Sequence, residues 1–178
     1  LPVYFGNPAS EHASTFLDMN GIGRVLVMSP YRQLNPLESF HFQDLLGIEK
    51  VYGLNNPDGV SARHQLSESY LKRLCLFGES VTYAKLASLM AKGAVLKITS
   101  ITDNFTHEHF LQRYGETAIP LVYITKDNKV KVISNTENNQ QPNDIELVSL
   151  LPIEAQEHAI LQRAREEAAE REAKAKAK

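Results

Sequence analysis

The chain of 178 residues is predicted to have an α/β fold, in which a partial parallel sheet is followed by a small α+β module. Over residues 1–54, short apolar runs alternate with helical segments, as in parallel sheets with crossover helices. One run, residues 25–28, is apolar at every position, which is typical of a strand covered on both faces. After residue 78 the pattern changes to alternating strands joined by a helix and a tight turn.

The first segment supplies signals for both ends of its helices. Strands are predicted at residues 3–5, 25–28 and 51–54. Ser10 is a suitable N-cap for the first helix, and Gly21 is expected to end it. Asn35 is predicted as the N-cap of the second helix, with Pro36 at the first helical position and Gly47 as the stop.

The middle of the chain is predicted to close one unit and open another. Leu66, Tyr70, Leu74 and Phe77 repeat at helical spacing, so a helix is expected there, with Cys75 inside it. Further helices are predicted between residue 82 and Gly93 and over residues 105–114, and strands over 95–102, 119–125, 130–133 and 145–151. The chain is expected to divide into three parts. Residues 1–77 form a partial parallel, Rossmann-like unit, residues 78–152 form an α+β module, and residues 153–178 form a charged tail.

The tail consists mainly of Ala, Glu, Lys and Arg, and its apolar stripe ends after Leu161. A solvated helix that frays, or a disordered segment, is the favoured interpretation, with a docking helix as the alternative. Carboxylate pairs such as Glu166 and Glu167 are assigned to this solvated face.

The composition excludes several classes of protein. A net charge of −2, a pI near 6.3 and the absence of a basic stripe with aromatics disfavour nucleic-acid binding. Cys75 is the only cysteine, which excludes an internal disulfide and a thiolate zinc site, and a buried, inert thiol is expected. No apolar run reaches the ~20 residues that span a bilayer, so a soluble fragment is expected.

One missing feature shapes the functional interpretation. A complete Rossmann dinucleotide-binding fold opens with a strand that runs into a glycine-rich turn at a helix N-terminus. Gly21 and Gly23 do not make that turn, because they follow a helix, precede a strand and lack a third glycine. The first unit is therefore interpreted as partial and Rossmann-like, and NAD binding is not expected. Because Leu1 is not Met, we expect the missing strand to lie upstream in a longer protein.

Candidate ligand-binding residues follow the first two predicted strands. Gly6, Asn7 and Ser29 lie where open α/β sheets bind ligands, and the guanidinium of Arg32 can pair with a phosphate. Alternatively, Gly6 makes a tight turn, Asn7 caps a helix and Arg32 is solvated. Asn35 already has a role as helix cap, so a ligand role for it needs an independent observation.

Catalytic and metal-binding constellations are not recognisable. The six histidines are scattered, and His107 and His109 are two residues apart, which directs them to different faces of a helix. The sequence has no Gly-x-Ser-x-Gly elbow, no His-Glu-x-x-His motif and no cysteine beside a basic cluster. An enzyme is not expected, and no metal site is predicted.

Several segments resemble RCK domains, the regulators of potassium conductance that are also called Trk-type nucleotide-binding domains. Residues 1–10 resemble the third-strand signature, an apolar strand that ends in Gly-Asp before a helix of small residues, with Asn7 in place of the acid. Residues 24–30 resemble the next strand, and residues 34–36 the start of the following helix. Residues 118–125 and 144–152 are similar to the companion C-terminal RCK domain.

Residues 96–106 give this resemblance a more specific form, because they are similar to cytoplasmic domains fused behind the membrane part of bacterial sodium/proton antiporters. The resemblance implies a regulatory domain for cation transport at the cytoplasmic face of the bacterial inner membrane. A homodimer is expected, because the missing strand and helix would otherwise leave an open sheet edge and an apolar surface. The partner that the resemblance implies is the membrane transport domain of the same polypeptide. Gly6, Asn7 and Ser29 would then face an adenine or ribose, which makes an adenine nucleotide the implied ligand.

Two other interpretations are kept. The main alternative is a free-standing soluble sensor of a small ligand such as a nucleotide. The second is an enzyme whose N-terminal half is missing. The sequence does not identify the transported ion, the effector or the direction of regulation.

Overall fold

The computed structural model describes residues 6–8, 10–16, 21–30, 35–55, 75–135 and 143–176. The protein has a mixed α/β fold with two compact units. The first unit comprises Leu1–Ala84 and Ser134–Thr136, and the second comprises Lys85–Ile133 and Glu137–Lys178. The division falls near the start of helix α4 (Tyr83–Ala91), a few residues after the boundary expected from the sequence.

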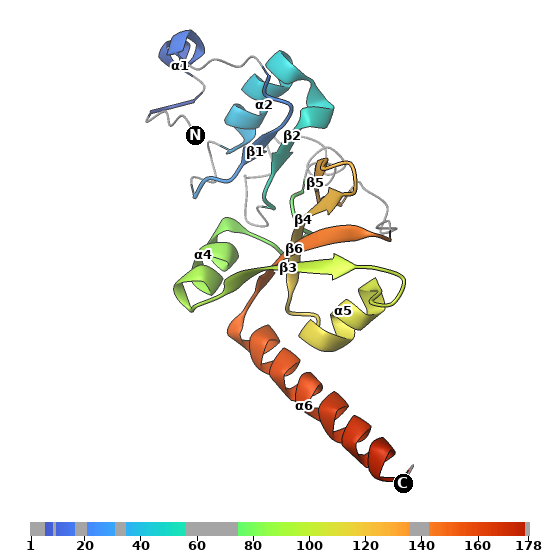
Figure 1. Ribbon diagram of the computed structural model, residues 1–178. Coiled ribbons are helices and arrows are strands. Elements are labelled where there is room, and N and C mark those ends of the chain that lie inside the picture. Colours follow the sequence, from blue (N-terminus) through green and yellow to red (C-terminus); the bar gives the residue numbers. More distant parts are fainter. Residues whose placement is uncertain are drawn as a thin grey trace. The chain divides into compact units, whose positions relative to one another are not determined.

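A parallel pair of strands is the centre of the first unit (Figure 1). Its elements are α1 (Glu11–Phe16), β1 (Val25–Val27), α2 (Asn35–Leu46), the 3-10 helix η1 (Ile48–Lys50) and β2 (Val51–Gly53). Val25 lies opposite Val51 in the β1–β2 register, and the parallel direction confirms the prediction from the strand–helix–strand order. Helix α2 packs on this pair, and Val27, Phe42 and Val51 form a buried cluster.

Local sequence signals define the helix ends in this unit. The Oγ of Ser10 accepts a hydrogen bond from the backbone N–H of Ala13 at 3.1 Å, which confirms the predicted N-cap of α1. Gly47 ends α2 with a φ of +94°, and its N–H donates to the carbonyl of Gln43 at 2.8 Å. Helix α2 begins at Asn35 itself, one position earlier than predicted.

The prediction of a helix around Cys75 was wrong for the part that the structure describes. Cys75 is extended and bridges Gly53 in the parallel direction, while Leu76 bridges Ser134 in the antiparallel direction. Cys75 and Leu76 are consecutive in the sequence and both are buried. Burial of consecutive residues is typical of extended backbone that is covered on both faces. Leu66, Tyr70 and Leu74, on which the helical spacing depended, lie outside the described residues.

The second unit contains an antiparallel sheet of four strands in the order β3-β6-β4-β5. Its strands are β3 (Val95–Ile101), β4 (Ile119–Thr125), β5 (Val130–Val132) and β6 (Ile145–Leu151), and its helices are α5 (His107–Tyr114) and α6 (Ile153–Lys176), together with most of α4. The bounds of β4 and β6 are those predicted from the sequence. A turn from Thr125 to Lys129, with Asn128 at a φ of +57°, connects β4 to β5 as expected.

The core of the second unit lies on one face of this sheet, under α5 and the start of α6. Phe110 of α5 and Leu147 of β6 are fully buried there, and Ala155 of α6 is also fully buried. Beyond Gln162 the described side chains of α6 are exposed, and the helix extends away from the sheet (Figure 1). The tail predicted at 153–178 is therefore a docked helix in its first turns and a solvated helix in its later turns.

Candidate functional site

The predicted ligand site is described only in part. Ser29 is half-buried and lies two residues beyond β1, at the carboxyl end of the parallel pair. Gly6 and Asn7 are exposed and precede α1. Arg32, the strand predicted at residues 3–5 and the side chain of Asn35 lie outside the described residues. A ligand role for these positions stays a prediction.

The edge near Ser29 is closed by hydrogen bonds from the ends of the strands. The N–H of Leu54 donates to the carbonyl of Val27 at 3.4 Å, so the two parallel strands end together. The side-chain amide of Asn55 donates to the carbonyl of Glu79. This edge thus combines two strand ends with the turn that follows Leu76, which is the usual place for ligands in open α/β sheets.

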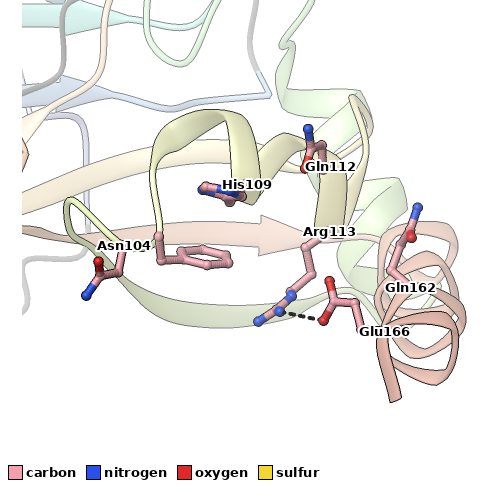
Figure 2. A pocket seen from close by; sticks show the side chains of 7 residues that line it. Asn104, His109, Gln112, Arg113, Gln162 and Glu166 are labelled. Carbon is pink, nitrogen blue, oxygen red and sulfur yellow. Dashed lines mark hydrogen bonds and ion pairs between the residues drawn. The ribbon is translucent and has the colours of Figure 1, made fainter. Parts of the chain in front are cut away.

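A second candidate site, which sequence reasoning missed, is a polar cleft of about 390 Å³ between α5 and α6 (Figure 2). It lies entirely within the second unit. Its lining residues are Asn104, Phe105, His109, Gln112, Arg113, Gln162 and Glu166. Its volume falls in the range of small-molecule sites, but its lining is more polar than is usual for them.

Arg113 is the residue that joins the two walls of the cleft. Its Nη2 lies 3.0 Å from Oε2 of Glu166, and Figure 2 shows the two side chains reaching toward each other from α5 and α6. The guanidinium carbon is 4.9 Å from the centre of the Phe105 ring, within the range of a cation–π contact. The backbone carbonyl of Arg113 accepts a hydrogen bond from Nδ1 of His158 at 2.9 Å. The Nε of Arg113 is buried without a hydrogen-bond partner among the described residues.

His109 closes the N-terminus of α5. Thr106 is the N-cap, and its Oγ1 accepts from the N–H of His109 at 3.5 Å, while Nδ1 of His109 accepts from the N–H of Thr106 at 3.1 Å. This is a capping box in which an imidazole replaces the usual Glu or Gln. The same ring stacks on Phe105, with centroids 5.9 Å apart. The Nδ1 of His109 also lies 3.0 Å from the Oγ1 of Thr106.

His107 lies on a different side of α5, as the two-residue spacing predicted. Its ring stacks on Phe110 at a centroid distance of 5.9 Å, and its Nδ1 is buried without a partner in the described part of the chain. Burial lowers the pKa of His107 from its ordinary value. The neutral form of this histidine is therefore the one that the fold stabilises.

Cys75 and Lys126, outside the cleft, also have shifted pKa values. Burial, with a smaller contribution from the charge of Glu79, raises the pKa of the Cys75 thiol, which makes it a poor nucleophile. A hydrogen bond from Lys126 to Asp144 at 2.7 Å and the charge of that carboxylate raise the pKa of Lys126 on the exposed surface. Within the described ranges, no three His, Cys, Asp or Glu side chains are grouped as metal ligands.

Chemically, the cleft offers hydrogen-bond donors and one ion pair. Arg113 and Glu166 carry opposite charges, so their pair gives the cleft no strong preference for an anion or a cation. His109 and Arg113 are four residues apart on α5, so the sequence alone predicts that they share the helix face that forms one wall of the cleft. The sequence does not predict that Glu166 lies on the other wall, because it is 53 residues from Arg113 and reaches it only through the packing of α6 beside α5. The Glu166 side chain is 56% exposed, as expected for the solvated face of the tail, and it pairs with Arg113 from there.

Comparison of the chain with protein-family models, with curated proteins and with solved structures gave no match. The class of protein is therefore defined here by the fold, a two-unit mixed α/β chain with one parallel and one antiparallel sheet. None of the helices in the described parts of the chain combines the length and the apolar character needed to cross a bilayer.

Proposed function

We propose that this chain is an RCK-type cytoplasmic regulatory domain of a bacterial cation/proton antiporter, which forms a homodimer and modulates transport in response to a ligand or ion. The main support is the order of its two units. A parallel strand–helix–strand unit precedes an antiparallel unit with the order β3-α5-β4-β5-β6. These units correspond to the segments that resemble the N-terminal and the C-terminal RCK domains, respectively.

The proposed effector is an adenine nucleotide at the edge of the parallel pair. Ser29 and the end of β2 would lie near the nucleoside, and Arg32 would pair with a phosphate. The sequence has no glycine-rich turn to hold a pyrophosphate, so NAD is not the expected ligand. Such an effector would regulate transport by binding one state of the antiporter more tightly than the other.

Transport assays on the parent antiporter test this function. The intact protein is compared with a variant that lacks residues 1–178 and with a control that lacks only residues 163–178. The first variant should still transport, but with an altered response to cytoplasmic ion, pH or nucleotide. The control should respond like the intact protein, because the later turns of α6 extend into solvent.

The cleft between α5 and α6 favours a second candidate function, a small-ligand sensor that acts without a membrane partner. Its lining of amide, imidazole, guanidinium and carboxylate groups suits a small polar ligand. Calorimetric titrations distinguish the two functions. The isolated chain is titrated with a panel of nucleotides and amino acids, and each titration is repeated with the Arg113→Ala variant. Binding that depends on Arg113, together with unchanged transport in the truncated parent, would favour the free-standing sensor.

A further inference from the structure

We propose that the outer edge of β3 is a dimer interface, at which a second copy of this chain pairs its own β3 in the antiparallel direction. The two four-stranded sheets would then form one continuous sheet of eight strands. This inference rests on the proposed homodimer and names its surface, but it does not depend on a role in transport.

The two edges of the four-stranded sheet differ in a way that selects β3. Strand β3 pairs with β6 over seven residues, from Val95 opposite Leu151 to Ile101 opposite Ile145, without a register shift. In the described residues, no strand pairs with its other side. The opposite edge, β5, is only three residues long. Short edge strands are protected against pairing, whereas a long, regular edge is a template for another strand.

The side chains of β3 are also unusual for an exposed edge. Leu96 is 62% exposed and Ile98 is 58% exposed, and they share one face of the strand because they are two residues apart. Val95, on the other face, is 45% exposed. Lys97 is the only charged residue of β3, and the strand has no proline. Apolar side chains beside unpaired backbone groups mark a surface that another chain covers.

One antiparallel register pairs all seven residues of β3 without placing like charges opposite each other. A two-fold axis at Ile98 places Ile98 opposite the partner's Ile98, Leu96 opposite the partner's Ser100, and Lys97 opposite the partner's Thr99. A two-fold axis at Lys97 would instead place two ammonium groups directly opposite each other, which is destabilising. This charge pattern favours a second copy with its axis at Ile98.

The area of the contact indicates a weak dimer. A stable interface buries about 800 Å² on each partner, and pairing of one seven-residue strand supplies only part of that area. The mass of the protein should therefore increase with concentration, from one chain toward two.

Sedimentation equilibrium of the 178-residue chain tests the interface. The wild-type mass should rise from 20.0 kDa toward twice that value as the concentration increases. Ile98→Lys places two lysines on the axis and should keep the chain monomeric. Val130→Lys is the matched control, because Val130 is 52% exposed on the opposite edge strand, and it should behave like wild type. A wild-type chain that stays monomeric, or equal loss of the dimer in both variants, would overturn the interface.

Cross-linking tests the register without relying on the charged variant to fold. With the axis at Ile98, the two Cα atoms at position 98 would lie about 4.5–5.5 Å apart, within disulfide range. Ile98→Cys should therefore form a covalent dimer under mild oxidation. Leu96→Cys should not, because its two copies would be about 13 Å apart along the strands. The wild type is the background control, since Cys75 is buried. Equal cross-linking at 96 and 98, or none at 98, would contradict this register.

Discussion

His109 occupies the position of α5 where Glu or Gln usually closes a capping box, and this gives a single residue control over a helix end. The Nδ1 of His109 accepts the N–H of Thr106 at 3.1 Å and lies 3.0 Å from the Oγ1 of the same residue. Loss of the imidazole is therefore expected to weaken the first turn of α5.

His109→Ala should lower the thermal midpoint, because it removes the side chain that accepts the N–H of Thr106. His109→Gln should retain most of the wild-type stability, because Gln is a usual partner in a capping box. Loss of an N-cap interaction costs about 0.5–2 kcal/mol. Thermal unfolding followed by circular dichroism at pH 7.5 measures the difference, with His12→Ala, at an exposed position of α1, as the control. Equal midpoints for wild type and His109→Ala would refute the role of the cap.

His107 should cause a loss of stability on acidification. Its pKa is lowered by burial in the folded state, so the unfolded chain binds the proton more tightly. The contribution of neutral His107 to the free energy of unfolding is therefore fully present above the ordinary histidine pKa. It is lost as the pH falls from that value toward the lower pKa of His107 in the folded protein. Denaturant unfolding at pH 7.5 and pH 5 should show a smaller loss for His107→Leu than for wild type. An equal loss in the two proteins would contradict this assignment.

At the residue scale, interactions within one turn were predictable and distant ones were not. Ser10 as the cap of α1 and Gly47 as the stop of α2 follow from local rules. Arg113 and Glu166 meet only because α6 packs beside α5, which no short motif encodes. The candidate ligand residue Ser29 was predicted from the rule for strand ends, and its ligand role stays a prediction.

At the scale of elements, α6 divides into a docked and a solvated part. Removal of residues 163–178 should leave the fold nearly unchanged. It eliminates the exposed Arg113–Glu166 pair, and such pairs contribute about 0–1 kcal/mol. The thermal midpoint should fall by no more than about 4 °C, as expected for a loss of ~1 kcal/mol in a chain of this size.

Ala155→Glu, in the buried first turns of α6, is the contrasting variant and should lower the midpoint far more. Differential scanning calorimetry measures both changes. A large loss on truncation would show that the later turns of α6 are also docked.

Helices and strands were predicted correctly where the spacing of apolar residues in a segment matched only one of the two structures. Residues 119–125 and 145–151 are largely apolar runs that follow polar segments, and both strands were predicted with the observed limits. Around Cys75 the same reasoning failed, because apolar residues at helical spacing led into two buried residues that form isolated β-bridges. Pairing of Leu76 with Ser134 crosses more than fifty residues of sequence and could not be anticipated locally.

At the scale of the whole molecule, the fold predicts weak nucleotide recognition by this chain alone. Calorimetric titration should show no micromolar binding of NAD or NADH, because no glycine-rich turn is present to hold the pyrophosphate. Any weaker binding of an adenine nucleotide near Ser29 should be reduced by Arg32→Ala and unaffected by Arg24→Ala, the control just before β1. Micromolar affinity for NAD would show that the pyrophosphate is held by other groups.

The class of fold and the order of the two units were predictable, but the arrangement of the second sheet was not. Strand–helix–strand alternation predicted the parallel pair, since its connection is local. The order β3-β6-β4-β5 places the last strand between the first and second strands of that sheet. Such a non-local pairing leaves little trace in the sequence of either strand.

The central claim, that the chain regulates an antiporter, is tested most directly by transport in inverted vesicles at matched protein levels. The half-activating concentration of cytoplasmic ion or nucleotide is measured for the intact parent and for the variant without residues 1–178. Coupling between domains is typically about 1–3 kcal/mol, so a shift of roughly 5- to 150-fold is predicted, with transport itself retained. Superimposable response curves would contradict a regulatory role.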